Sequence, residues 1–286
     1  MRERILVLGA TGMLGEPVAR QLHEAGFVVR IVVRDVAKAQ KMFSESFELV
    51  DGDVTDVASL RQAMTGCYGV HISVGGAVDQ ISAENVATLA PELDVAHITY
   101  ISGSTVQKEN GWFPMTAQKL AAETAVIQSH IPYSIFCPTW PMEQLPRFII
   151  GGQATLVGDR PVPWRWFAAA DLGRMVVQAY QREGALNKRL YVHGPEPLSM
   201  PEALDQYCRT FHPEISAVNM LPIERARRIA ASTGNQMLAY FADLMAYFQQ
   251  VGEPGDAAEA NDLLGAPTTT LADWIAQRKT EQEGEK

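Results

Sequence analysis

The chain has 286 residues, 47% of them apolar, which is enough to bury a large core in one α/β domain, with or without a smaller lobe. Its net charge of -9 disfavours nucleic acid and anionic membranes as partners, because both require a basic surface. No apolar run reaches the ~18 residues of a membrane-spanning helix, no signal peptide precedes the first predicted strand, and the three cysteines lack CxxC spacing. We therefore expect a cytoplasmic protein without a disulfide framework or a metal site.

The first predicted strand, residues 4–8, runs into a glycine-rich turn and then into an amphipathic helix that closes at Gly26. This order of strand, turn and helix is the context that a dinucleotide-binding motif requires. Gly9 permits the sharp exit from the strand, Gly12 lets backbone N–H groups approach a pyrophosphate, and Gly15 allows the helix to pack close to the sheet. The positive end of the helix dipole then faces the phosphates. The predicted nucleotide contacts in this turn are Gly9, Thr11, Gly12, Met13, Leu14 and Gly15.

Strands and helices alternate through the rest of the first half. The predicted strands are 27–34, 47–50, 68–73, 97–101 and 133–136, and the predicted helices are 36–43, 56–64, 79–93 and 116–129. Helices of this length between strands indicate right-handed crossovers. The fold class is therefore predicted to be α/β, with a Rossmann-type, doubly wound parallel sheet.

After Pro138 the alternation weakens, because prolines and a Gly-Gly pair crowd into a short span and predict loops that leave the sheet. The later predicted elements are helices 171–180 and 200–211, a strand over 190–193 and a long helical segment over 223–249. We assign 1–138 and roughly 167–195 to the Rossmann domain, and 139–166 and 196–276 to a smaller lobe on the substrate side. The charged tail 277–286 is expected to be frayed.

The end of the second strand carries the residues that select between NAD and NADP. Arg34 can bind a 2′-phosphate through its forked guanidinium, and Lys38, one turn later, adds positive charge. Asp35 would then point away or cap the next helix. In the alternative interpretation, Asp35 binds the ribose 2′-hydroxyl of NAD and Arg34 is a solvated surface residue. We favour NADP(H), with NAD(H) as the alternative.

Further nucleotide contacts are expected after the third and fourth strands. Asp53 and Val54 are placed to contact the adenine, although a helix or turn cap explains Asp53 nearly as well. Gly75 would let the end of the fourth strand lie against the central part of the cofactor.

The fifth strand delivers Ser102, Ser104 and Thr105 to the carboxyl edge of the sheet, where α/β proteins bind ligands. The GxxGxxG spacing, with Ala-Thr inside it, resembles the short-chain dehydrogenase/reductase superfamily, in particular its extended and atypical branches. There a serine on this strand is followed by Tyr-x-x-x-Lys on the next helix, spaced so that both side chains meet one ligand. Here Lys119 is present, but Met115 stands at the tyrosine position.

The missing tyrosine and the downstream sequence resemble the NmrA-like atypical branch. The matching pieces are Lys119, Glu123, Ser129, 131–143, 158–161, 167–173, 191–196 and 263–271, which span almost the whole chain. Cys137 departs from the pattern, because an arginine often precedes the proline at this point. The resemblance implies that Lys119 holds the nicotinamide ribose, that Pro138 lies at the cofactor, and that Ser104 orients a substrate. The other interpretation of Lys119 and Glu123 is an i,i+4 surface pair.

Members of this branch transfer hydride from NAD(P)H to quinones or related acceptors, or bind the nucleotide and report redox state without turnover. Methionine cannot donate a proton, whereas a reduced quinone can be protonated by water, so Met115 is most compatible with quinone reduction. The resemblance thus implies an NADPH-dependent oxidoreductase with a small, quinone-like acceptor beneath the 140–165 loops. The alternative is a silent NADP(H)-binding regulator that docks a protein partner, and a nucleotide-sugar epimerase or dehydratase ranks third. Homo-oligomerisation is left open.

Overall fold

The structure, a computed structural model, describes residues 3–284 and divides into two compact units. Unit 1 contains the chain up to Pro138 together with Ala169–Val192 and Asp256–Pro267. Unit 2 contains Thr139–Ala168, His193–Gly255 and the chain from Thr268 onward. No helix within residues 3–284 combines the length and the apolar character that crossing a bilayer requires.

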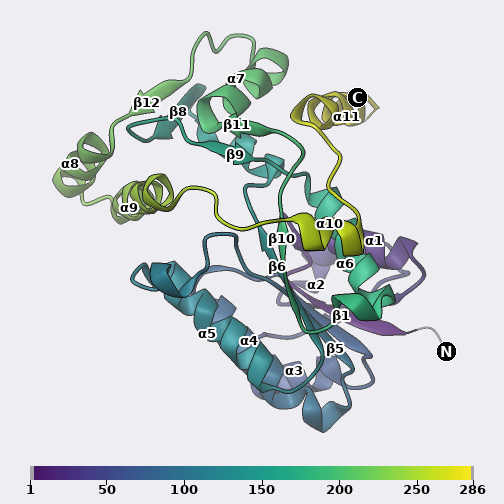
Figure 1. Ribbon diagram of the computed structural model, residues 1–286. Helices are drawn as coiled ribbons and strands as arrows, with labels where there is room; N and C mark the ends of the chain where they lie inside the picture. Colours follow the sequence, from purple (N-terminus) through teal and green to yellow (C-terminus); the bar gives the residue numbers. More distant parts are fainter. Residues whose placement is uncertain (1–2, 285–286) are drawn as a thin grey trace. The chain divides into compact units, whose positions relative to one another are not determined.

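Unit 1 is built on a parallel sheet with the strand order β10-β6-β5-β4-β1-β2-β3 (Figure 1). Its strands are β1 (Arg4–Leu8), β2 (Val28–Val33), β3 (Glu48–Asp51), β4 (Gly69–Ile72), β5 (His97–Ile101), β6 (Tyr133–Pro138) and β10 (Lys188–Val192). Central strands such as β1 and β5 are buried along almost their whole length because helices cover both faces of the sheet. The order reverses between β1 and β4, which confirms the predicted Rossmann-type topology.

Helices form a layer on each face of this sheet (Figure 1). The helices of unit 1 are α1 (Gly15–Glu24), α2 (Val36–Gln40), α3 (Val57–Met64), α4 (Asp79–Leu89), α5 (Pro114–Gln128), α6 (Ala169–Gln181) and α10 (Ala258–Leu264). α1 packs against α6, and α4 packs against α3 and α5. The approach of α1 to α6 is close, since a Cβ added at Gly173 would lie 3.1 Å from the Pro17 carbonyl oxygen.

Three basic side chains of unit 1 bind the segment that carries α10. Lys188 Nζ lies 2.6 Å from a carboxylate oxygen of Glu259. Arg182 donates to the carbonyl of Leu263 at 2.8 Å, and Arg174 donates to the carbonyl of Ala266 at 2.7 Å. The guanidinium groups therefore satisfy carbonyls at and beyond the C-terminal end of α10, which have no partner within the helix.

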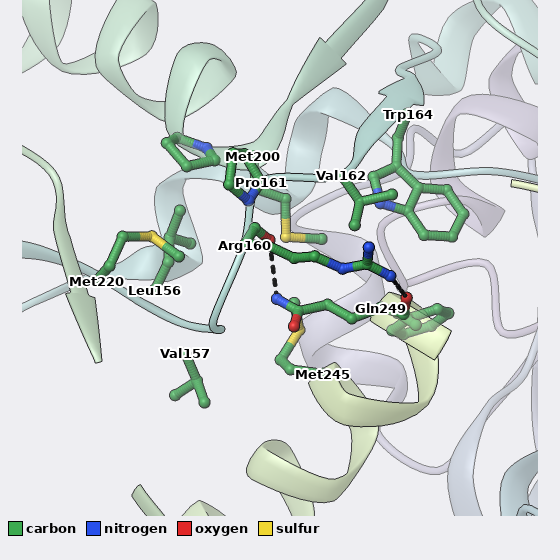
Figure 2. Close-up of a pocket in the computed structure, with 12 residues that line it drawn as sticks. Leu156, Val157, Arg160, Pro161, Val162, Trp164, Met200, Met220, Met245 and Gln249 are labelled. Carbon is green, nitrogen blue, oxygen red and sulfur yellow. Dashed lines mark hydrogen bonds between the residues drawn. The ribbon is translucent and has the colours of Figure 1, made fainter. Parts of the chain in front are cut away.

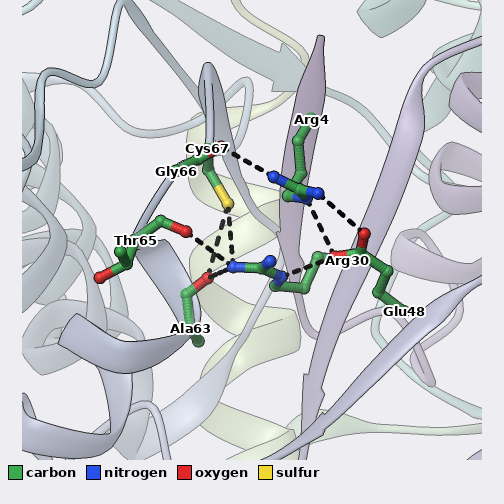
Figure 3. A network of polar contacts seen from close by, with 7 residues as sticks. All are labelled: Arg4, Arg30, Glu48, Ala63, Thr65, Gly66 and Cys67. Carbon is green, nitrogen blue, oxygen red and sulfur yellow. Dashed lines mark hydrogen bonds and ion pairs between the residues drawn. The ribbon is translucent and has the colours of Figure 1, made fainter. Parts of the chain in front are cut away.

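A polar network joins three strands at the amino ends of the sheet (Figure 3). Arg4 of β1 and Arg30 of β2 both donate to Glu48 of β3, each at 2.9 Å from Nε. Arg30 also donates to the carbonyls of Ala63 and Thr65. This network lies at the edge opposite to the carboxyl ends of the strands.

Unit 2 contains two small sheets and a helical layer. Its strands are β7 (Ile149–Ile150), β8 (Gln153–Val157), β9 (Pro163–Arg165), β11 (Pro197–Ser199) and β12 (Asn219–Leu221), and its helices are α7 (Met200–Phe211), α8 (Ile223–Thr233), α9 (Gln236–Val251) and α11 (Leu271–Gly284). β9 pairs with β11, and β8 pairs with both β7 and β12. Aromatic rings dominate the core, where Trp140 lies 4.9 Å from Phe248 and 6.0 Å from Trp166 between ring centroids.

A loop of unit 2 is held against the end of α9 by a reciprocal pair of contacts (Figure 2). Gln249 donates from its side chain to the Arg160 carbonyl at 2.9 Å, and Arg160 donates to the Gln249 carbonyl at 2.8 Å. The adjoining pocket, lined by Trp164 and three methionines among others, has a volume of about 20 Å³. That space holds about one water molecule, so the pocket is too small for an organic ligand.

The structure differs from the expectations about the second half at three places. The helical segment expected over 223–249 is two helices, because Gly234 has φ +68° and Asn235 caps α9 through its side chain. The tail from 277, which we expected to be frayed, is the exposed end of α11 as far as Gly284, and the buried residues of that helix include Trp274 and Ile275. The rest of the expected tail, 285–286, lies outside the described residues. Unit 1 also takes up Asp256–Pro267, which we expected in the smaller lobe.

Candidate functional site

The glycine turn lies at the carboxyl edge of the sheet, where the strand order reverses. Gly9 has φ +80°, and a Cβ there would lie 2.3 Å from the Ser73 carbonyl oxygen. A Cβ at Gly15 would lie 2.1 Å from the Gly9 carbonyl oxygen. Because a side chain at either position would collide with backbone, the sequence can form this turn only with glycine at both places.

The start of α1 follows a partly exposed turn and has no side-chain cap. Leu14 occupies the N-cap position and makes no side-chain cap. Thr11 and Gly12 are exposed, while Met13 is half-buried. The first N–H groups of a helix lack acceptors within the helix and carry the positive end of its dipole. The turn therefore suits an anion such as a pyrophosphate.

A cavity of about 590 Å³ opens at the carboxyl ends of β1 to β4, within unit 1. Its volume lies in the range of sites that bind small organic ligands. The residues that line it are Gly9, Thr11, Val32, Val33, Arg34, Asp35, Lys38, Gly52, Asp53, Val54, Thr55, Val74 and Val78. Six of the predicted nucleotide contacts thus share one wall, namely Gly9, Thr11, Arg34, Lys38, Asp53 and Val54.

The two aspartates of this cavity each have a hydrogen-bond partner. Asp35 accepts from the backbone N–H of Lys38 at 2.9 Å and caps α2, as one of our two interpretations expects. Asp53 accepts from both the N–H and the hydroxyl of Thr55, each at 2.8 Å. Those bonds, with a smaller contribution from the charge of Arg34, lower the pKa of Asp53. Asp53 therefore caps a turn, which was the alternative interpretation of this residue. It also lines the cavity.

The other predicted contacts of the turn lie outside the cavity wall. Gly12, Met13, Leu14 and Gly15 belong to the turn and to the first residues of α1. Gly75 precedes the short turn that leads into α4, and no atom lies within 4 Å of the position a Cβ would take there. The predicted contacts of the adenosine and phosphate groups thus fall into two sets, one that lines the cavity and one outside its lining, while Lys119 and Pro138 belong to neither.

Lys119 belongs to a second group of polar residues, at the carboxyl end of β5. Its Nζ lies 2.7 Å from Asp79 Oδ2 and 3.0 Å from the Ile101 carbonyl oxygen, to both of which it donates. The Tyr100 hydroxyl lies 3.4 Å from the same Nζ and donates to Asp79 Oδ1 at 3.0 Å. The lysine side chain is 16% exposed and that of Asp79 only 4%. The ammonium thus sits at the ligand edge of the sheet with its charge balanced by a buried carboxylate.

Tyr100 cannot take the place of the tyrosine that Met115 replaces. Its side chain is fully buried, and its hydroxyl proton is already donated to Asp79. Burial, together with the nearby Asp79 charge, raises the pKa of Tyr100 well above its usual value. A buried phenol with a raised pKa has no access to a substrate and no tendency to ionise.

Glu123 forms an ion pair with Arg189, a residue that the sequence alone did not indicate. Arg189 of β10 donates to Glu123 from Nε at 3.0 Å, and Ser102 donates its hydroxyl to the same carboxylate. Lys119 pairs with Asp79 instead, so the interpretation of Lys119 and Glu123 as an i,i+4 surface pair is wrong. Cys137, where the family pattern often has arginine, is buried beside this pair, and burial raises the pKa of its thiol.

Ser104 lies beside Pro138, and both are predicted site residues. The Ser104 N–H donates to the Pro138 carbonyl at 2.9 Å, which ties the loop after β5 to the end of β6. Within residues 3–284 the Ser104 hydroxyl has no hydrogen-bond partner, whereas the Ser102 hydroxyl is committed to Glu123. Ser104 is therefore the serine of this segment whose hydroxyl remains available to a ligand, although its residue is largely buried.

The residues that the sequence analysis did not single out are Asp79, Tyr100, Thr55 and Arg189. Only Asp79 carries a local signal, because it opens the helix that follows the fourth strand and its glycines. No three His, Cys, Asp or Glu side chains in the described part of the chain come together as a metal site.

The strand order, the glycine turn and the cavity beside it define a protein of the Rossmann-type, nucleotide-binding class. Comparison with known families is more specific. Residues 1–275 match the model of the NmrA-like family, so the chain belongs to that family.

Among curated proteins, an NAD(P)H azoreductase of Xenophilus azovorans is 26% identical over 282 residues, covering 94% of this chain and 96% of the azoreductase. A (4-alkanoyl-5-oxo-2,5-dihydrofuran-3-yl)methyl phosphate reductase of Streptomyces griseus is also 26% identical, over 279 residues that cover 96% of this chain and 97% of the relative.

Among solved structures, an NADPH-dependent quinone oxidoreductase of Escherichia coli in complex with NADPH superposes with a TM-score of 0.78 at 21% identity. The triphenylmethane reductase of Citrobacter sp. in complex with NADP(H) superposes with a TM-score of 0.77, also at 21% identity. Each match covers 96% of this chain and 99% of the other chain. At such identity the likeness establishes a shared fold.

Proposed function

We propose that this protein is an NADPH-dependent oxidoreductase that reduces a small, quinone-like acceptor. The observation that carries the proposal is the cavity beside the glycine turn, which has a guanidinium and an ammonium on its wall. The residues fit a dinucleotide. Gly9 and Gly15 let the turn pack backbone against backbone, and the exposed Gly12 has no side chain in the way of a pyrophosphate. The start of α1 has no side-chain cap, which suits an anion there.

In this proposal Arg34 and Lys38 bind the 2′-phosphate of the adenosine half. Asp35 already accepts a backbone N–H as the cap of α2, and this contact would compete with its use as a ribose ligand. NAD(H) is the alternative cofactor, since Asp35 keeps a second carboxylate oxygen and lines the same cavity. The other half of the cofactor would meet Lys119, Ser104 and Pro138 at the carboxyl ends of β5 and β6.

When bound, NADPH supplies a hydride to the acceptor. Met115 cannot supply the accompanying proton, and the phenol of Tyr100 is buried. An acceptor that takes its proton from water fits these two facts, and a quinone is such an acceptor. The names of the relatives, which include an azoreductase, a quinone oxidoreductase and a triphenylmethane reductase, support a flat, conjugated acceptor.

The second candidate function is a nucleotide-binding regulator without turnover. The observation that favours it is the ion pair of Lys119 with Asp79 in a site that has methionine, Met115, at the tyrosine position. Such a protein would bind NADP(H), leave it unchanged and pass its redox state to a protein partner.

Two measurements on the purified protein separate these functions. Calorimetry with NADPH, NADP⁺, NADH and NAD⁺ establishes whether and which nucleotide binds; we expect preference for the phosphorylated pair. The absorbance of NADPH at its near-ultraviolet maximum is then followed with benzoquinones, naphthoquinones and azo or triphenylmethane dyes. Oxidation that requires both the protein and an acceptor supports the reductase, and tight binding without oxidation by any acceptor supports the regulator. Failure to bind any of the four nucleotides would refute both.

A further inference from the structure

Asp79 is a buried carboxylate between the two groups of residues that the cofactor would meet. It is the first residue of α4 and is 3% exposed, and two residues just before it, Val74 and Val78, line the cavity. A carboxylate is stabilised in the first turn of a helix, which supports an ionised Asp79 at this place. Its side chain turns toward β5 and α5, where it meets Tyr100 and Lys119.

Both carboxylate oxygens of Asp79 are engaged. The Tyr100 hydroxyl donates to Oδ1 at 3.0 Å and the Lys119 ammonium donates to Oδ2 at 2.7 Å. Tyr100 is fully buried in the sheet, so its hydroxyl is a fixed point that sets the orientation of the carboxylate. The short contact to Nζ then sets the position of the ammonium.

One N–H of Lys119 makes only a long hydrogen bond, which a ligand oxygen can replace. Asp79 and the Ile101 carbonyl take two of its three protons at 2.7 and 3.0 Å, and the third has only the Tyr100 oxygen at 3.4 Å. Lysine is otherwise a flexible side chain whose ordering costs conformational entropy when a ligand binds. An ammonium that is already fixed avoids this cost.

We propose that Asp79 is a positioning residue for the cofactor: it holds the Lys119 ammonium at the carboxyl end of β5, ready for the nicotinamide-side ribose. The proposal rests on the proposed function, because it takes NADP(H) as the ligand and Lys119 as its contact. It gives Lys119 a role that does not require a tyrosine at position 115, since the buried Asp79 carboxylate, with the Tyr100 hydroxyl, gives the ammonium its position.

The test compares the affinity of the protein for NADPH with its affinity for a fragment of NADPH. NADPH reaches both groups of residues, whereas adenosine 2′,5′-bisphosphate carries only the adenosine half and its phosphates. Asp79→Asn keeps the size of the side chain and removes its charge. We expect the affinity for NADPH, measured by calorimetry, to fall about tenfold, and the affinity for adenosine 2′,5′-bisphosphate to stay within about twofold. A change that merely damaged the fold would weaken both.

A double-mutant cycle tests whether Asp79 acts through Lys119. If it does, Asp79→Asn lowers NADPH affinity in the native chain but changes it by less than about twofold in the Lys119→Met background. Tyr100→Phe, which removes only the hydroxyl on Oδ1, provides a second, milder variant with the same expected pattern, should Asp79→Asn fail to fold. Glu48→Gln is the matched control: it also breaks ion pairs of unit 1, but at the amino ends of the strands (Figure 3), and should change neither affinity.

The outcomes separate the two proposals. If the unmodified protein binds adenosine 2′,5′-bisphosphate and NADPH, and Asp79→Asn binds both as tightly as before, the positioning role is refuted while the proposed function stands. Equal loss of both ligands in Asp79→Asn would also refute it, because the carboxylate would then only support the fold. If the unmodified protein binds neither ligand, the proposed function itself fails.

Discussion

Replacing Gly15 by alanine tests the close packing of α1 on the glycine turn. The added Cβ would lie 2.1 Å from the Gly9 carbonyl oxygen and 2.7 Å from its carbon, whereas real Cβ contacts essentially never fall below 3.0 Å. Because the obstacle is backbone, α1 and the turn must move apart. Overpacking of this kind costs about 1–3 kcal/mol, and the helix propensity of alanine offsets at most about 1 kcal/mol. We expect a net destabilisation of about 1–2 kcal/mol and weaker NADPH binding.

Gly12→Ala is the matched control, because Gly12 is exposed and its added Cβ would have only one contact, 3.1 Å from the Gly9 oxygen. Its stability should change by less than about 0.5 kcal/mol, as for most surface substitutions. Its NADPH affinity should still fall, since the methyl group would stand where the pyrophosphate approaches. Urea unfolding followed by far-ultraviolet circular dichroism gives the stabilities, and calorimetry gives the affinities. Gly15→Ala with unchanged stability would refute the packing argument, and Gly12→Ala with unchanged affinity would refute the phosphate assignment.

Three further predictions concern charge. Arg34→Ala should lower the affinity for NADPH about tenfold and change the affinity for NADH by less than about twofold. If calorimetry showed the two affinities falling equally, Arg34 would not be the 2′-phosphate ligand. Glu123→Gln leaves the half-buried Arg189 without its carboxylate and should destabilise the protein by about 2–3 kcal/mol in urea, a loss that Arg189→Met in the same chain should partly restore. Burial lowers the pKa of His71 to about 3 and that of His97 to about 4. Below pH 6.5 the unfolded chain therefore binds protons that the folded one excludes, and the free energy of unfolding should fall as the pH falls, by up to about 1.4 kcal/mol per pH unit for each histidine. In His71→Gln, the slope of stability against pH between 6.5 and 4 should be about half as steep, and an unchanged slope would contradict the assignment.

Local sequence signals were sufficient for much of the fold and for the residues that line the cavity beside the glycine turn. The glycine turn is encoded by one short segment, residues 9–15. Arg34 and Lys38 could be predicted because they lie at and just after the end of a predicted strand. The pairing of Lys119 with Asp79 spans 40 residues along the chain. It depends on how α4 and α5 pack, which no local pattern encodes.

Other misses have equally physical reasons. The break at Gly234 lies inside an apolar pattern that continues on both sides, so periodicity alone joined α8 to α9. The charged residues from 277 gave no sequence signal for a helix, but they continue α11, whose Trp274 packs in the core of unit 2.

The place of α10 in unit 1 has a consequence for the order of folding during synthesis. The Rossmann sheet ends with β10, yet the contacts of Arg174, Arg182 and Lys188 with the segment around α10 require residues up to Ala266. Unit 1 therefore cannot complete its contacts until all of His193–Gly255 has been translated. Until then the three basic side chains lack these partners, and most of the sequence of unit 2 is available before unit 1 completes its contacts.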